Sequence, residues 1–533
     1  MRGGPLPDTD RAVGVLRRPA RYSPRVNSPK LLITLGILLT FWLGTLPAQA
    51  EEYFKVRSFE NKGRAVAGQM ADLNGDGRTD FFVVNLTGIP PEDQRTARVF
   101  LQDENGQFPA SPNFERLLPV WSSVYDVEDV RPETPGAELL ILLPDGVEVI
   151  SLAAPDAPHW NFMTPGPTTM GPAADERGLE VFQLVHRHLG DAPWMLIPQI
   201  GQLTALDGEG NVLSALAQPR RANFFILPPT TLVSLESDFQ IFLDAPKLLL
   251  GDINGDGRND IASATRHEIW VSYQKEDGQF AFEPDEKLPL RMVTPRDQVR
   301  GSGGVASSVG DIDGDGRLDL VVSHVQGGFS DAITRVHVYL NREGRWQIDQ
   351  PNQTIVEEGS ISSNALVDMD RDGTMELVQL QFKFSLFEVI EILVSREIDL
   401  EFSIYRYDGE NGFAKKPWVR RQISLPISFK TFRTRGFIPT ARYDVNGDGY
   451  LDYVSSGDGD KLTVNPGGPK GLFKERAASQ KVRTAGMIDF SDWNGDRLPD
   501  FLIFDPHNFD VPVQLGRNLG RLPGTPASLQ GNP

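Results

Sequence analysis

The 533-residue sequence predicts an all-β fold: a single β-propeller of seven or eight four-stranded antiparallel blades. Three observations support this prediction. A nine-residue acidic pattern occurs six times, each copy is followed by a β-branched or aromatic run, and a glycine turn beside an aromatic residue comes later in the unit. Units of three or four short strands bury their apolar sheet faces when they stack radially as blades. A linear β-solenoid is the competing architecture, but its repeating rungs are much shorter than these units.

Residues 1–50 are predicted to form a signal peptide. An apolar run of 16 residues, 31–46, follows Lys30 and precedes Pro47-Ala48-Gln49-Ala50. The run is shorter than the roughly 20 residues of a membrane span, and an uncleaved N-terminal anchor is the alternative. No later run reaches membrane-spanning length without charges, so the mature chain is expected to lack a membrane span. We therefore expect an exported protein that is periplasmic, on the cell surface or secreted.

The composition excludes several classes of partner and site. The formal charge is −19, from 53 Lys and Arg against 72 Asp and Glu. Residues 1–50 hold seven basic and two acidic residues, so their removal brings the charge to −24. Binding to a phosphate backbone needs clustered basic charge, and we expect no nucleic-acid partner. The absence of Cys excludes disulfides, thiol nucleophiles and thiolate metal sites.

The acidic pattern divides residues 51–533, the expected propeller domain, into units. Its copies lie at 72–80, 252–260, 311–319, 368–376, 444–452 and 492–500. Their first residues are separated by 180, 59, 57, 76 and 48 positions, and 180 is three times 60. This spacing predicts two decayed units before residue 252. The candidates run from 125–130 into 135–142 and from 181–185 into 193–197, which makes about eight units.

The strands follow the loops in order. Residues 81–84 and 320–322 are typical of buried strands, and 336–340 alternates as a second strand would. The region near 382–405 breaks the pattern, because 384–394 is too densely apolar for a half-exposed strand. We predict a short helix or an elongated hairpin inserted there and packed on the propeller; an exposed partner surface is the alternative. Residues 53–59 precede the first loop and are expected to close the ring by joining the strands after Asp500.

The acidic loop has the chemistry of a calcium site. Oxygen-bearing side chains stand at positions 1, 3, 5 and 9, glycine at position 6 permits a sharp turn, and position 7 would offer a carbonyl. Hard oxygen ligands favour calcium. An EF-hand closes at position 12 between helices, so this is not one; a metal-free Asp/Asn/Gly turn is the alternative. The predicted ligands, in about four to five sites, are Asp72, Asn74, Asp76, Asp80, Asp252, Asn254, Asp256, Asp260, Asp311, Asp313, Asp315, Asp319, Asp368, Asp370, Asp372, Glu376, Asp444, Asn446, Asp448 and Asp452.

The six copies differ in quality. Those that start at 72, 252, 311 and 444 are complete. The 368 copy has Arg371 at position 4 and Glu376 at position 9, whose longer arm is expected to reach the ion. In the 492 copy Arg497 replaces the glycine and Pro499 stiffens the exit, so this loop is expected to fold less tightly and to bind weakly or not at all.

These residues resemble the FG-GAP/VCBS repeat family, the calcium-loop blades shared with the integrin alpha-chain propeller, certain fungal lectins and many exported bacterial proteins. The similarity is close over 66–77, and Gly251-Asp252 and Gly310-Asp311 keep the family's Gly-Asp step. It covers nearly all of 51–533, strongly at six loops and weakly across 120–245. The resemblance implies a propeller of seven or eight blades with calcium in its loops. It implies no particular ligand, because such propellers serve adhesion, lectin binding and, less often, catalysis.

We therefore expect a non-catalytic binding or adhesion module for a glycan or protein ligand. The alternative is an extracellular carbohydrate-active enzyme, a polysaccharide lyase or hydrolase. Catalysis needs a neighbouring acid and base, and the sequence identifies no such pair, no catalytic residue and no site for an organic cofactor. His186 and His188 would share one strand face, as a surface or core pair with a metal site as the alternative, and His337 is expected to be structural.

One basic stretch stands out against the acidic background, and it could dock an acidic glycan or partner. Its members fall within 21 positions and have Trp418 and Phe432 among them. The alternative is a solvated strand edge whose charges discourage edge pairing. The basic residues are Lys415, Lys416, Arg420, Arg421, Lys430, Arg433 and Arg435.

Overall fold

The computed structural model describes most of the chain after the predicted signal peptide. It covers residues 52–530 except 90–91, 120–121, 171–178, 191, 228–237, 244, 301–302, 328–331, 384–391, 393–394, 411, 429–432, 469–472 and 474–475. The signal peptide itself, Lys430, Phe432 and most of the apolar segment 384–394 lie outside the described residues. Among the described helices, none has the length and apolar character to cross a membrane.

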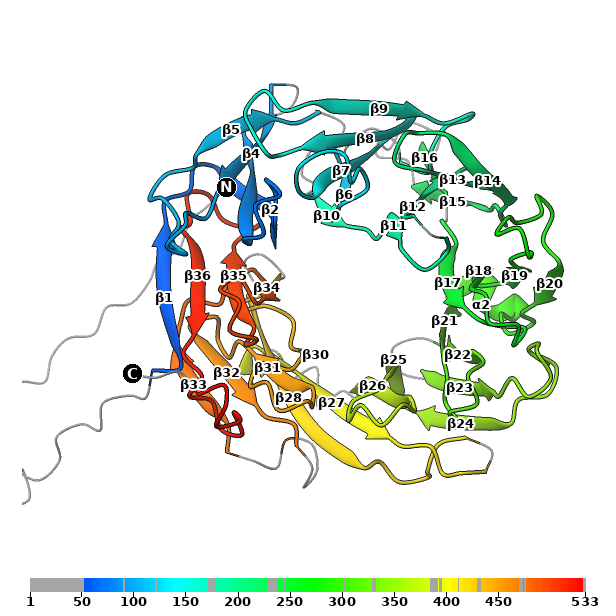
Figure 1. Cartoon of the computed structure of the whole chain (residues 1–533). Helices are drawn as coiled ribbons and strands as arrows, with labels where there is room; N and C mark the ends of the chain where they lie inside the picture. Colours follow the sequence, from blue (N-terminus) through cyan, green and yellow to red (C-terminus); the bar gives the residue numbers. More distant parts are fainter. Residues whose placement is uncertain are drawn as a thin grey trace, which may run out of the picture. The chain divides into compact units, whose positions relative to one another are not determined.

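Residues 52–530 form an eight-bladed β-propeller (Figure 1), which confirms the predicted fold and the higher blade number. The first blade is β2 (Arg64–Ala71), β3 (Asp80–Thr87), β4 (Gln94–Phe100) and β5 (Phe114–Leu117). The second is β6 (Val124–Glu128), β7 (Glu138–Leu143), β8 (Gly146–Ser151) and β9 (His159–Met163), with β10 (Glu180–Val181) added in parallel to β6. The third is β11 (Val185–His186), β12 (Trp194–Gln199), β13 (Gln202–Leu206) and β14 (Val212–Ala217). The fourth is β17 (Lys247–Gly251), β18 (Asp260–Ala264), β19 (Glu268–Ser272) and β20 (Glu286–Pro289).

The other four blades continue in chain order until the last one. The fifth is β21 (Gly304–Gly310), β22 (Asp319–Gln326), β23 (Ile333–Tyr339) and β24 (Gln353–Glu358). The sixth is β25 (Ser360–Val367), β26 (Glu376–Lys383), β27 (Glu397–Tyr405), β28 (Val419–Ser428) and the two-residue β29 (Arg433–Thr434). The seventh is β30 (Thr440–Tyr443), β31 (Asp452–Ser455), β32 (Lys461–Asn465) and β33 (Ala478–Lys481). The eighth is β34 (Met487–Ser491), β35 (Asp500–Phe504), β36 (Val513–Asn518) and β1 (Phe54–Phe59).

Burial along each blade explains the pattern of the sequence. The second strands β3, β7, β12, β18, β22 and β35 are buried over nearly their whole length, and they are the continuous apolar runs. The fourth strands β5, β9, β20 and β24 alternate between half-buried and exposed residues. A strand that neighbouring blades cover on both faces needs apolar residues throughout, whereas a strand at the rim does not.

The two decayed units are confirmed as blades. The candidate at 125–142 supplies β6 and β7, and the candidate at 181–197 supplies β10, β11 and β12. Their connecting segments lack the acidic ligand set, but the apolar second strands remain, with all six residues of β7 and of β12 buried. Packing between blades therefore persists where the acidic loop has been lost.

The N-terminal strand closes the ring as predicted. Strand β1 pairs antiparallel with β36, from Phe54 opposite Asn518 to Phe59 opposite Val513, in the same sheet as β35. Eight apolar clusters lie between consecutive blades, and one of them joins Phe59, Phe81 and Phe100 to Leu502 and Phe504 across the seam. The first and last blades are thus packed as the others are.

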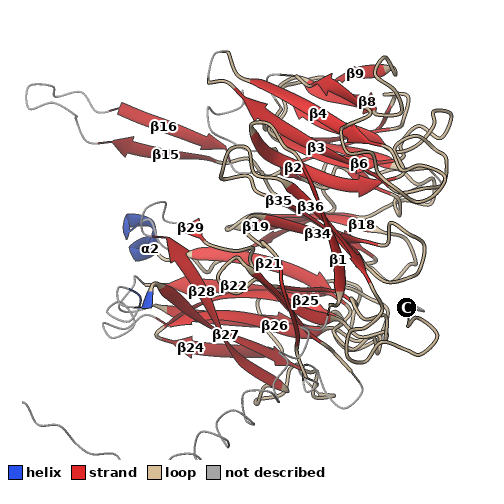
Figure 2. Cartoon of the chain, turned by 90° about the vertical axis from the view of Figure 1, so that its left-hand side faces the viewer, coloured by secondary structure: helices blue, strands red, loops and turns tan. Residues whose placement is uncertain are grey.

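Two segments depart from the repeating blade. Strands β15 (Ala222–Leu227) and β16 (Asp238–Leu243) form a separate two-stranded hairpin that projects from the propeller (Figure 2), and helix α2 (Pro295–Arg300) follows the fourth blade. The sequence analysis anticipated neither. For the predicted insertion near 382–405, β26 and β27 pair as a hairpin from Leu377 opposite Tyr405 to Gln381 opposite Glu401. Most of the segment between these strands lies outside the described residues.

Candidate metal centres

All six acidic loops occupy the same place in their blades: each joins the first strand to the second. Within the 311 loop, the Asp311 carboxylate at position 1 accepts the N–H groups of Gly314 and Gly316 at 2.7 and 2.8 Å. Both glycines have positive φ, 77° and 83°, a conformation that glycine adopts without steric strain. The loops at 72, 252, 444 and 492 repeat both hydrogen bonds. The repeated sequence therefore encodes a repeated turn.

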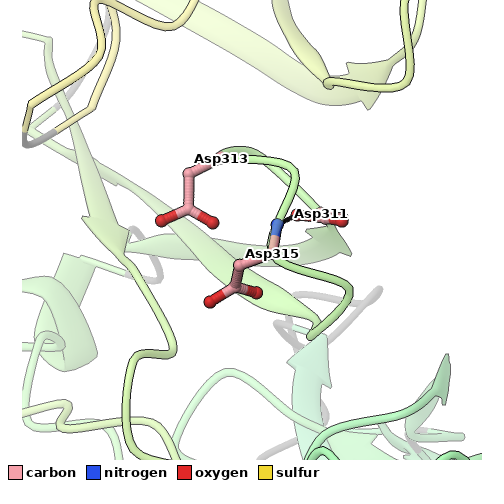
Figure 3. A group of neighbouring side chains, drawn as sticks. All are labelled: Asp311, Asp313 and Asp315. Carbon is pink, nitrogen blue, oxygen red and sulfur yellow. Dashed lines mark hydrogen bonds between the residues drawn. The ribbon is translucent and has the colours of Figure 1, made fainter.

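Three carboxylates of the 311 loop lie near one another (Figure 3). One oxygen each of Asp311, Asp313 and Asp315 lies within 4.8 Å of the other two. The Oδ1 atom of Asp313 is buried and has no hydrogen-bond partner. Burial, and then the charges of Asp315 and Asp311, raise the pKa of Asp313. An unpartnered oxygen among three acids is a donor set that could hold a cation.

The acid at position 9 lies beneath the loop. Asp319 is fully buried, and its two oxygens accept the N–H groups of Ile312 and Asn341 at 2.8 and 2.6 Å. It is not among the three acids that converge in this loop, so the predicted ligand at position 9 is not brought to the cluster. Asp319 instead connects the loop to the end of β23, the third strand of the blade, because Asn341 follows β23.

Burial and neighbouring charges raise the pKa of the acid at position 9 in every loop. Burial raises the pKa of Asp80 and Asp260 to about 6, of Asp319, Glu376 and Asp452 to about 7, and of Asp500 to about 8, against partly compensating backbone hydrogen bonds. The charges of neighbouring loop carboxylates contribute to these raised values. Asp319, Glu376, Asp452 and Asp500 are thus partly or mostly protonated at neutral pH when no cation lies beside them.

These raised pKa values predict a pH dependence for the protein in chelator. The folded chain retains protons near pH 5 to 7 that the unfolded chain releases near pH 4, so the free energy of unfolding is largest at low pH in this range. It should fall as the pH rises from about 5 to 8, because the buried acids then ionise. Urea midpoints measured at both pH values with chelator present test this. A midpoint that increases with pH would contradict the raised pKa values.

The remaining loops arrange their ligands differently. Of the described residues, a second group of three acids converges in the 368 loop, where Asp368, Asp370 and Glu376 meet within 4.8 Å, without Asp372. No third group of this kind is found among them. In the 72, 252 and 444 loops the side-chain amide of the asparagine at position 3 donates to the position-5 carboxylate. These loops have an asparagine at position 3 where the 311 and 368 loops have a third acid, which makes them a weaker donor set for a cation.

An arginine at position 7 compensates the position-5 carboxylate in three loops. Arg317 pairs with Asp315 and donates from Nε to the carbonyl of Asn341 at 2.7 Å. Arg78 and Arg258 make the same two contacts in the 72 and 252 loops. The sequence analysis assigned position 7 only through its backbone carbonyl, so it missed this side-chain role.

The 492 loop folds more tightly than expected. Arg497 replaces the glycine at position 6, yet it adopts φ 71° and its N–H donates to Asp492 at 2.8 Å, as the glycines do. The expectation that the loop would fold less tightly is therefore wrong, because the surrounding hydrogen bonds hold a non-glycine residue in the left-handed region. Whether this loop binds a metal stays a prediction.

The strained conformation predicts the effect of restoring glycine. Arg497→Gly should raise the free energy of unfolding by about 1 kcal/mol, since a left-handed non-glycine residue costs about 1–2 kcal/mol and glycine returns part of this as unfolded-state entropy. Denaturant midpoints of the variant and the parent test it. As a control, Gly495→Ala in the same loop (φ 77°) should destabilise. If Arg497→Gly destabilised instead, Arg497 would have to make a stabilising contact.

The histidines and the basic stretch do not assemble a second site among the described residues. His337 bonds Thr354 Oγ1 through Nδ1 at 3.0 Å, which fits a structural role. Strand β11 ends at His186, so His186 and His188 do not share one strand as expected. In the basic stretch, Arg420 pairs with Glu401 at 3.1 Å and Arg435 with Asp458 at 3.6 Å. Because these arginines already pair with acids, the basic stretch is better explained as a solvated strand surface than as a docking site for an acidic partner.

Comparison with known proteins agrees with the loop pattern. The FG-GAP-like repeat model matches residues 252–322, which span the fourth blade's loop and reach into β22. No curated protein matches the sequence. Similar solved structures include an Agrocybe aegerita lectin described as recognising non-reducing terminal N-acetylglucosamine, at 14% identity and TM-score 0.33, covering 70% of this chain and 90% of the lectin. Another is the Dos1 propeller, at 10% identity and TM-score 0.32, covering 87% of this chain and 95% of that one.

Neither structural similarity bears on function at these identities and TM-scores. The blade architecture and the matched repeat support one conclusion from independent directions. The chain is an eight-bladed β-propeller that contains an FG-GAP-like repeat at residues 252–322.

Proposed function

We propose that the chain is an exported, calcium-binding β-propeller that acts as a non-catalytic binding module for a glycan or protein ligand. The observation that carries the calcium assignment is the 311 loop, where carboxylate oxygens of Asp311, Asp313 and Asp315 lie within 4.8 Å of one another and Oδ1 of Asp313 is buried without a hydrogen-bond partner. Carboxylate oxygens are the ligands that calcium prefers. Asp311, Asp313 and Asp315 would hold the ion, and the ion would neutralise the negative charge that remains after Arg317 pairs with Asp315.

The perturbed acids support a structural rather than a catalytic use of these loops. Asp80, Asp319 and Asp452 are fully buried, and both oxygens of each accept backbone N–H groups. A general acid or base must reach a substrate proton, and acids placed like this have no access to one. Calcium in the neighbouring loops would stiffen the blades and hold a ligand-binding surface in shape.

A glycan-array screen with calcium or with chelator tests the binding function. Calcium-dependent retention of a glycan supports a binding module. Time-dependent loss of a polysaccharide substrate would instead support the alternative, an extracellular lyase or hydrolase. Export is tested separately: N-terminal sequencing of protein recovered outside the cytoplasm should begin at Glu51, and recovery of the uncleaved chain in the membrane fraction would indicate an anchor.

A further inference from the structure

The 368 loop differs from the 311 loop at three positions that shape the site. Arg371 replaces the glycine at position 4, Thr374 replaces the arginine at position 7, and Glu376 replaces the aspartate at position 9. Arg371 has φ 55° and its guanidinium lies 3.6 Å from Asp444, the first acid of the next loop. Thr374 donates to Asp372 at 2.6 Å and brings no charge. The position-7 arginine that compensates the 72, 252 and 311 loops is therefore missing here.

The longer arm of Glu376 changes how the loop is tied to its blade. In the other five loops one oxygen of the position-9 aspartate accepts a backbone N–H from a residue at or just beyond the end of the third strand of the blade. This residue lies two positions after the last third-strand residue that pairs with the second strand, as Asn341 does for Asp319. The equivalent residue in the sixth blade is Tyr407. Glu376 accepts the N–H of Met369 at 2.8 Å, but no such bond from Tyr407 is present among the described residues. Glu376 belongs to the group of three acids with Asp368 and Asp370.

The guanidinium of Arg406 lies near the Glu376 oxygen that does not accept the N–H of Met369. Arg406, the residue directly after β27, forms an ion pair with Asp370, and its Nε lies 3.8 Å from Glu376 Oε1. Its Cζ atom lies 3.4 Å from the ring centroid of Trp418, which holds the group by a cation–π contact. The Asp370 side chain is only 9% exposed, and its Oδ1 has no hydrogen-bond partner. One arginine thus faces two of the three acids that could hold a cation.

We propose that Arg406 is the built-in counter-cation of the 368 loop, which keeps this loop metal-free while the 311 loop takes calcium. A calcium ion would have to displace the guanidinium from Asp370, break its contact with Trp418 and approach a fixed positive charge. Each of these steps lowers the affinity of the loop for a divalent ion. The comparison with the 311 loop rests on the proposed calcium binding. On this proposal the 368 loop, one of the predicted ligand sets, holds no calcium.

Removing the charge of Arg406 should convert the loop into a calcium site. Arg406→Met keeps an apolar contact with Trp418 but leaves three acids without a cation. By equilibrium dialysis the variant should bind one more calcium per chain than the parent. Its melting temperature should lie below that of the parent in chelator and should rise more than that of the parent when calcium is added. Arg406→Gln, which keeps a hydrogen-bond donor, serves as a second variant and should gain the same ion if the methionine variant does not fold.

Two control variants separate this effect from a general loss of charge. Arg406→Lys keeps the cation and should bind the same number of ions as the parent. Arg317→Met removes the matched arginine from a loop that already takes calcium, so its count should not rise. Folded Arg406 variants without charge that bind no more calcium than the parent would overturn the inference. If the parent itself bound no calcium, the proposed calcium binding would fail, whichever result the variants give.

Discussion

Replacing Phe59 with alanine is expected to lower the free energy of unfolding by about 3–5 kcal/mol. Phe59 is 2% exposed and belongs to β1, the strand that completes the eighth blade, while its ring packs on the first blade. The ring centroid lies 5.3 Å from that of Phe81 and 5.4 Å from that of Phe100, both in edge-to-face contact. Loss of the ring leaves a cavity at the seam where the propeller closes. A closed ring is stabilised at this seam as at every other blade interface.

Ser58→Ala is the matched control, because Ser58 lies beside Phe59 on the same strand and is exposed. Its free energy of unfolding should stay within about 0.5 kcal/mol of the parent's value. Urea titrations followed by both circular dichroism and tryptophan fluorescence give the two midpoints. If Phe59→Ala behaved like Ser58→Ala, β1 would not hold the ring closed, and the pairing of β1 with β36 would have to form only weakly.

The repeat made most of the fold predictable. Six loops in one register, with a gap of three repeat lengths, predicted seven or eight blades, because each blade must bury the same strand against its neighbours. The closing strand followed from the same reasoning, since residues 53–59 had no blade of their own. The turn geometry was also predictable where glycines stand at positions 4 and 6, because those positions need positive φ.

Contacts between distant segments account for what the sequence could not show. Arg406 lies 36 positions beyond Asp370, and only the pairing of β26 with β27 brings the two together. Arg497 was expected to disrupt its turn because residues other than glycine disfavour positive φ. The sequence does not show the hydrogen bonds that hold Arg497 in this conformation. The hairpin of β15 and β16 lies between residues 80 and 252, where the repeat spacing predicted two decayed blades. Its sequence pattern could not be distinguished from that of blade strands. The buried Asp319 accepts the N–H of Asn341, which lies 22 positions further along the chain, after β23.

Removing calcium with a chelator is expected to lower the melting temperature, and more at pH 8 than at pH 5. Each occupied site adds about 2.7 kcal/mol at 100-fold saturation, if the unfolded chain does not bind the ion. Calcium binds the ionised carboxylates, so protons compete with it at low pH. Without the ion, ionisation of Asp319 and Asp452, with pKa of about 7, removes stability as the pH rises through that value.

Calcium binds more tightly as the pH rises, and the calcium-free protein becomes less stable as its buried acids ionise. Both effects should widen the difference in melting temperature between calcium-loaded and chelated protein as the pH rises. Magnesium at the same concentration is the control for ionic strength, and it should stabilise less because it keeps its waters and demands a smaller octahedral site. Asp313→Asn should reduce the calcium effect, since it removes a charge from the one loop in which Asp311, Asp313 and Asp315 converge. Equal melting temperatures in calcium and in chelator at pH 8 would mean that the acidic loops are turns without metal, and the stability of the propeller would then rest on blade packing alone.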